Sequence, residues 1–96
     1  MKKEIKDDDK RLHGLAQEIT KHFSKDQKAM KQAEKLAKKA LDGNEKVLEY
    51  HLTYATILNK NGKKSEALKV AQESMGLAEK AGQGKFVRKL IQIIEG

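Results

Sequence analysis

The stretch Ala33–Leu41, AEKLAKKAL, returns 34 residues later as Ala67–Met75, ALKVAQESM. Alanine stands at the first and fifth positions of both stretches, and the fourth, eighth and ninth positions hold residues of similar size. Because residues three and four apart lie on one face of a helix, each stretch predicts a helix with a small-residue inner face. A period of this length is typical of chains built from repeated helix–turn–helix pairs.

The apolar spacing on either side of these stretches predicts about five helices in all. Their expected ranges are 9–23, 24–41, 45–60, 64–81 and 85–94, and the second is expected to be capped by Ser24. Glycine marks the later turns, because it accepts the left-handed backbone that ends many helices. Short turns favour antiparallel neighbours. The sequence therefore predicts an all-α fold, an antiparallel helix–turn–helix array.

Two local expectations follow from the same patterns. Gly43 should end the second helix in the left-handed conformation, and Asn44 should cap the third. In the first helix the apolar residues recur at helical spacing and should form a single buried stripe. These residues are Leu12, Leu15, Ala16, Ile19 and Phe23.

Length and composition narrow the class of protein. The 96 residues suit one domain, and we expect a flexible lead-in over 1–8 before a single helical domain over 9–96. There is no cysteine, which excludes disulfides and thiolate chemistry, and no apolar run approaches the ~18 residues of a membrane span. The charged N-terminus lacks the apolar core of a signal peptide. We therefore expect a cytoplasmic protein, or a periplasmic one if the chain is excised from an envelope protein.

The formal net charge of +7 bears on the choice of partner. It favours a lysine-rich solvated surface or an acidic protein or peptide partner. Of the 21 cationic residues only Arg11 and Arg88 are arginine, and the chain has four aromatic residues. Base readout favours arginine, and binding of single strands needs stacking aromatics. The composition therefore argues against nucleic acid as a partner. Of the three functional hypotheses for this chain, namely protein interaction, self-association and nucleic-acid binding, the last is the weakest.

No constellation for catalysis can be found in the sequence. His13 and His22 are nine residues apart, which places them on opposite faces of a helix, and His51 is expected to pack or to face a groove. The Gly82–Lys85 stretch lacks the spacing of a phosphate-binding loop. No serine stands in a recognisable relation to a base and an acid. We therefore predict a protein that is not an enzyme, with no cofactor and no metal site.

The second helix–turn–helix pair resembles a tetratricopeptide repeat. Small, large and turn residues stand near the positions that this family prefers, namely Tyr54, Ala55, Leu58, Gly62, Ala67 and Ala71. The resemblance implies two repeats, over 14–47 and 48–81, with a closing helix over 85–94. The chain departs from the family at Ala71, where an aromatic residue is frequent, at Glu79, where proline is usual, and at Lys28, where the turn glycine is expected.

The resemblance implies a scaffold that binds other proteins along a groove. Carried onto this sequence, the groove is lined by Glu18, His22, Lys25, Leu52, Thr56, Asn59 and Lys60. The version of the family that clamps a chaperone's C-terminal carboxylate uses lysines and asparagines there. Glu18, His22 and Thr53 do not fit that pattern, so a receptor of this kind is disfavoured.

A narrower resemblance covers about residues 50–75. Within it, residues 53–68, TYATILNKNGKKSEAL, look like the helical C-terminal tails of some bacterial thioredoxin-like envelope proteins. No C-x-x-C motif is present, so redox activity does not carry over. This resemblance implies that the chain is the accessory helical part of a longer protein.

The leading functional hypothesis is a protein-interaction or scaffold module. The alternative is self-association through the last helix, as a structural or accessory domain, because that helix has more apolar residues than one buried stripe needs. They are Phe86, Val87, Leu90, Ile91, Ile93 and Ile94.

Overall fold

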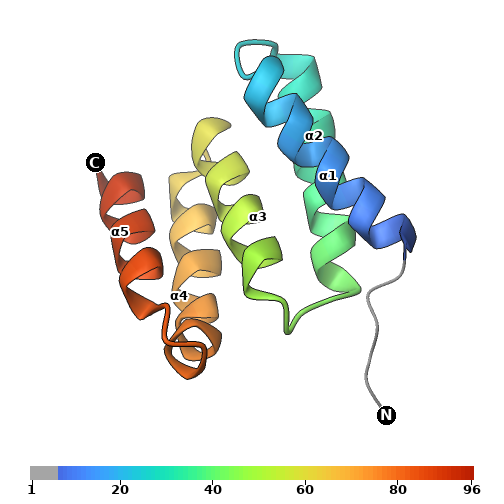
Figure 1. Ribbon diagram of the computed structural model, residues 1–96. Coiled ribbons are helices and arrows are strands. Elements are labelled where there is room, and N and C mark those ends of the chain that lie inside the picture. The colour runs from blue at the N-terminus through green and yellow to red at the C-terminus, as the bar shows by residue number, and fades with distance from the viewer. Residues whose placement is uncertain (1–6) are drawn as a thin grey trace.

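The computed structural model describes residues 7–96 and contains five α-helices joined by short turns (Figure 1). The helices are α1 (Asp7–His22), α2 (Gln27–Asp42), α3 (Leu48–Lys60), α4 (Lys64–Lys80) and α5 (Gly84–Glu95). No strand occurs among the described residues. The predicted all-α helix–turn–helix array is confirmed. Residues 1–6 of the expected lead-in lie outside the described residues, and α1 already begins at Asp7.

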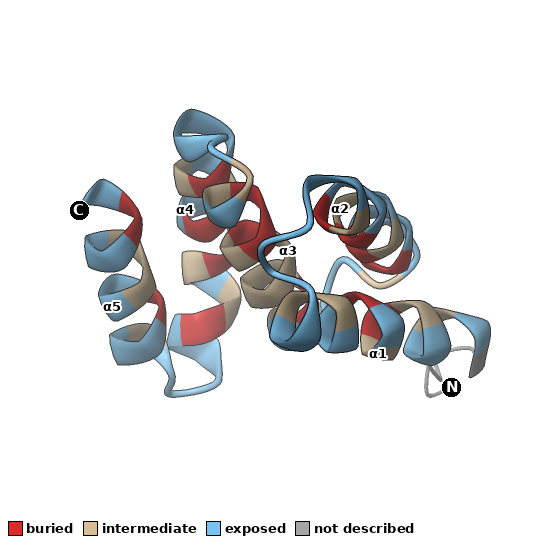
Figure 2. Ribbon diagram, turned by 90° about the horizontal axis from the view of Figure 1, so that it is seen from above, coloured by how far each residue is buried: buried red, intermediate tan, exposed pale blue. Residues whose placement is uncertain are grey.

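The five helices form two layers (Figures 1 and 2). Each helix packs against the next one along the chain, so that α1, α3 and α5 lie on one side and α2 and α4 on the other. Within their layer α1 contacts α3 and α3 contacts α5, whereas α2 and α4 do not meet within residues 7–96. The array therefore curves toward the layer of α1, α3 and α5, which we call the inner layer.

The repeated stretches form the packing faces of the outer layer. The small residues at their 34-spaced positions are at most 1% exposed, namely Ala33, Ala37, Ala40, Ala67, Ala71 and Ser74. Figure 2 shows the buried residues on the helix faces that meet. The Ser74 hydroxyl donates to the Ala71 carbonyl at 2.7 Å, which satisfies it inside the core. Small side chains allow the helix axes to approach closely. The 34-residue repeat in the sequence therefore corresponds to repeated packing positions on α2 and α4.

The buried stripe of α1 is narrower than predicted. Ala16 is fully buried, but Leu15 is 48% exposed and Phe23 is 56% exposed. Phe23 follows the end of α1 at His22 and so falls outside the helix. Since α1 is the first of the described helices, it packs only against α2 and α3 and buries one side. His13 is buried in their place.

Three caps differ from the expected chemistry. Asp26 rather than Ser24 caps α2, because its carboxylate accepts from the backbone N–H groups of Lys28 and Ala29. Gly43 has a right-handed φ of −85°. A side chain at Gly43 would meet the Asp9 carboxylate at 2.8 Å, so glycine serves close approach there. Asn44 does not cap α3, since its amide donates to Asp9 and to the Ala40 carbonyl, each at 2.9 Å.

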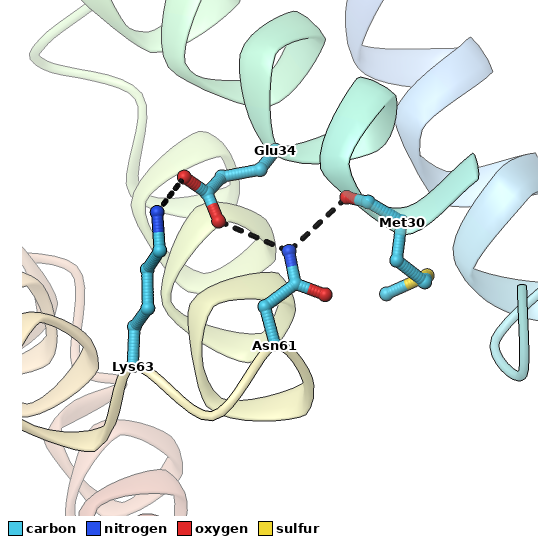
Figure 3. A network of polar contacts seen from close by, with 4 residues as sticks. All are labelled: Met30, Glu34, Asn61 and Lys63. Carbon is cyan, nitrogen blue, oxygen red and sulfur yellow. Dashed lines mark hydrogen bonds and ion pairs between the residues drawn. The ribbon is translucent and has the colours of Figure 1, made fainter. Parts of the chain in front are cut away.

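A polar network joins α2 to the turn between α3 and α4 (Figure 3). The Asn61 amide donates to the Met30 carbonyl at 3.1 Å and to Glu34 Oε1 at 3.0 Å, and Lys63 Nζ donates to Glu34 Oε2 at 2.7 Å. Burial raises the pKa of Glu34, but the hydrogen bonds from Lys63 and Asn61 and nearby lysine charges outweigh it, and the net pKa is lowered. Glu34 is therefore ionised. It links α2 of the first helical pair to the turn of the second pair.

Candidate functional site

The inner layer is hollowed between α1 and α3. The hollow has a volume of about 440 Å³ and is lined by Gln17, Thr20 and Lys21 of α1 and by Glu49, Leu52, Thr53, Thr56, Ile57 and Lys60 of α3. Ile57 is fully buried and Leu52 is half-buried. The Thr20 and Thr56 hydroxyls donate to backbone carbonyls of their own helices, at 2.7 and 2.8 Å. With these hydroxyls satisfied, an apolar ligand group can lie against α3 without leaving them unpaired.

The charges around this hollow are separated along the helix axes. Lys21 and Lys60 belong to the last turns of α1 and α3, and Glu49 belongs to the first turn of α3. Both helices run in the same direction, because the pairs alternate in an antiparallel array (Figure 1). The two lysines therefore lie at one end of the hollow and the glutamate at the other. Lysine also suits the negative carboxyl end of a helix.

A second, slightly smaller hollow continues the first toward α5. It is lined by Leu48, Glu49, Leu52, Ala81 and Gln83, and thus shares Glu49 and Leu52 with the first. Gln83 stands directly before α5. The two hollows form one surface that runs from α1 across α3 to the beginning of α5.

Below the first hollow, His13 fastens α1 to α3. Its imidazole stacks on the Tyr50 ring, with centroids 4.1 Å apart, and its Nε2 lies 2.9 Å from the Thr53 hydroxyl. Desolvation by burial lowers the pKa of His13 below its ordinary value, against a smaller opposing effect of Glu49. Burial, with the nearby charges of Asp9 and Glu49, raises the pKa of Tyr50. The His13 imidazole therefore links the two helices whose side chains line the first hollow.

The structure brings only part of the predicted groove together. Leu52, Thr56 and Lys60 line the first hollow. Glu18 and His22 lie on an exposed side of α1, where their side chains approach each other to 3.1 Å. The other two residues, Lys25 in the turn before α2 and Asn59 on α3, are not among the lining residues.

The register of the first helices explains which residues sequence reasoning missed. Ala16 and Ala55 are both fully buried against the second helix of their own pair, and they are 39 residues apart. On this register Gln17 corresponds to Thr56 and Lys21 to Lys60, and all four line the hollow. The 34-residue period instead aligns Glu18 with Leu52 and His22 with Thr56. The feature of the sequence that could have indicated the longer register is the pair of alanines at positions 16 and 55.

Among the described residues, no three histidine, aspartate or glutamate side chains gather as metal ligands would. Nor is any helix of residues 7–96 long and apolar enough to cross a bilayer.

Comparison with known proteins adds no family. No protein-family model matches the chain, and comparison with curated proteins and with solved structures gave no match either. The resemblances to tetratricopeptide repeats and to thioredoxin-like envelope proteins therefore stay predictions.

Proposed function

We propose that this chain is a non-catalytic, tetratricopeptide-like interaction module that binds a segment of another protein on its inner layer. The observation that carries the proposal is the hollow between α1 and α3, where half-buried Leu52 lies between a lysine end and Glu49. The hollow continues into the second one, so the surface is elongated. An elongated surface with an apolar centre and charged ends suits a peptide chain.

The two layers differ in the side chains that they bury, and this difference supports the proposal. The repeated small residues of α2 and α4 are buried and build the scaffold. Exposed side chains of the inner layer, such as Gln17, Lys21 and Glu49, are left to face a ligand. Curved surfaces of this kind are what helical arrays use for binding. The histidines favour a binding role over an enzymatic one, because His13 is buried against Tyr50 and His22 is paired with Glu18.

Selection from a displayed library of random peptides tests the proposal. The wild-type chain is the only selection target, and the variant Thr56→Arg, which fills the hollow, is tested afterwards with the enriched peptides. We expect the enriched peptides to bind Thr56→Arg about tenfold more weakly or worse, because a blocked central contact costs at least ~1.4 kcal/mol. Affinities are measured by fluorescence anisotropy on synthesised peptides.

The matched control is Gln72→Arg, which places the same side chain on an exposed position of α4 in the outer layer. It should leave peptide affinity unchanged, and circular dichroism should show both variants folded. Peptides that bind both variants equally, or that crosslink only to α2 and α4, would contradict the proposal.

A further inference from the structure

Two large apolar side chains of α5 are not used by the core. Phe86 is 64% exposed and Ile93 is 59% exposed, whereas the adjacent Val87 and Ile94 are buried. Residues seven apart lie on nearly the same side of a helix. Phe86 and Ile93 therefore form one exposed apolar strip along the edge of the buried face of α5.

The register of α5 places this strip on the inner layer. Ile94 shares a buried cluster with Ala67 and Ala71 of α4, just as Ile57 shares one with Ala33 and Ala37 of α2. Ile57 and Ile94 thus correspond, 37 residues apart. On this register Phe86 corresponds to Glu49 and Ile93 to Thr56, and both of those α3 residues line the first hollow.

The second hollow independently connects the strip to the site. Gln83, which lines that hollow together with Leu52, lies one helical turn before Phe86. The Phe86 backbone N–H donates to the Gln83 carbonyl at 3.1 Å, which continues the turn into α5. Phe86 therefore follows a residue of the second hollow by one helical turn.

We propose that the binding surface extends onto α5, and that it takes an acidic protein segment whose large apolar side chains lie against Leu52, Phe86 and Ile93. This inference rests on the proposed function and names the chemistry of the partner. We call the two hollows together with Phe86 and Ile93 the inner face.

Charge decides between an acidic partner and a second copy of the chain. The inner face carries Lys21 and Lys60, and Lys89 of α5 corresponds in register to Leu52, against a single carboxylate at Glu49. A second copy would place two faces of net positive charge against each other, which is unfavourable. An acidic segment complements them, and its attraction adds to that of the +7 chain as a whole.

Binding of defined peptides tests the inference. The probes are three fluorescein-labelled peptides of about 15 residues, one of glutamate and leucine in an amphipathic pattern, one with lysine for glutamate, and one with serine for leucine. We expect only the glutamate–leucine peptide to bind. The double variant Phe86→Ser/Ile93→Ser should weaken it about tenfold or more, and Lys89→Glu should weaken it most at low salt.

Leu15→Ser is the matched control, because it removes an exposed apolar side chain of α1 that does not line either hollow. Equal losses for this control and the double variant would show general stickiness and overturn the inference. If Thr56→Arg weakens the peptide but the double variant does not, the surface ends at α3, and the proposed function survives without its extension. Failure of the glutamate–leucine peptide to bind would overturn the inference, whereas the proposed function would still be decided by the peptide selection. A dimer in sedimentation velocity that the double variant abolishes would assign the strip to a second copy.

Discussion

His13 is the residue whose environment departs most from what its neighbours in the chain imply. It lies in a polar helix, yet it is 6% exposed and is held between the Tyr50 ring and the Thr53 hydroxyl. Its partners come from α3, about 40 residues later, as the separation of His13 and Thr53 shows. His13 is therefore a buried polar residue in the contact between α1 and α3.

The lowered pKa of His13 predicts a pH-dependent stability. Its folded-state pKa lies below the ordinary value of 6.5, so the unfolded chain takes up a proton more readily than the folded one. The contribution is complete above pH 6.5 and is lost as the pH falls through that value toward the folded pKa. Urea denaturation between about pH 7.5 and about pH 5.5 should show a falling free energy of unfolding.

The variant His13→Phe should flatten this pH dependence, because it keeps a ring on Tyr50 and removes the titrating group. His22→Phe, at an exposed position, is the control and should retain the wild-type slope. Parallel curves for wild type and His13→Phe would rule out the role of His13.

At the scale of single elements, the second helix of each pair is defined by small residues. Ala33, Ala37 and Ala40 of α2, and their counterparts in α4, are small buried residues, and in α2 they lie between the larger buried Met30 and Leu41. These faces cannot accommodate larger side chains without strain, because protein interiors are close-packed.

The variant Ala67→Leu should lower the free energy of unfolding by about 1–3 kcal/mol, since the larger side chain overpacks the junction of α3, α4 and α5. Gln72→Leu, which adds a leucine at an exposed position of the same helix, should change it by less than about 0.5 kcal/mol. Chemical denaturation followed by circular dichroism measures both. Similar values for the two variants would mean that the small-residue face tolerates bulk.

At the scale of the whole molecule, the two helical pairs are held together by a seam between α2 and α3. Its polar part is the network in which Asn61 reaches both the Met30 carbonyl and Glu34. Beside it lies a cluster that contains Met30 and Ile57. The seam sets how the pairs are inclined to one another, and thereby shapes the inner face.

Asn61→Ala should lower the free energy of unfolding by about 1–2 kcal/mol, because two hydrogen bonds across the seam are lost and the Met30 carbonyl loses a donor. Hydrogen exchange should quicken in α1 and α2 more than in α5. Asn59→Ala, one half-turn earlier, leaves the network in place and serves as the control. Equal effects of the two variants, in stability and in exchange, would show that the network does not join the pairs.

The amino-acid sequence alone predicts the helices and the buried small-residue faces of α2 and α4. Periodicity is local, so the spacing of alanine and leucine was sufficient to predict an all-α array and its repeated packing positions. The resemblance to tetratricopeptide repeats also named Leu52, Thr56 and Lys60 as groove residues, and these three line the hollow between α1 and α3.

The rotation of the first helix of each pair about its own axis depends on tertiary packing and could not be predicted from the sequence. Contacts with residues far along the chain set that rotation, such as those of His13 with Tyr50 and of Ala16 with α2. Rotation determines which side chains face the hollow, so Gln17 and Lys21 line it while Glu18 and His22 do not. The 34-residue period could not carry this information, because the first helices follow registers of 39 and 37 residues that arise from packing.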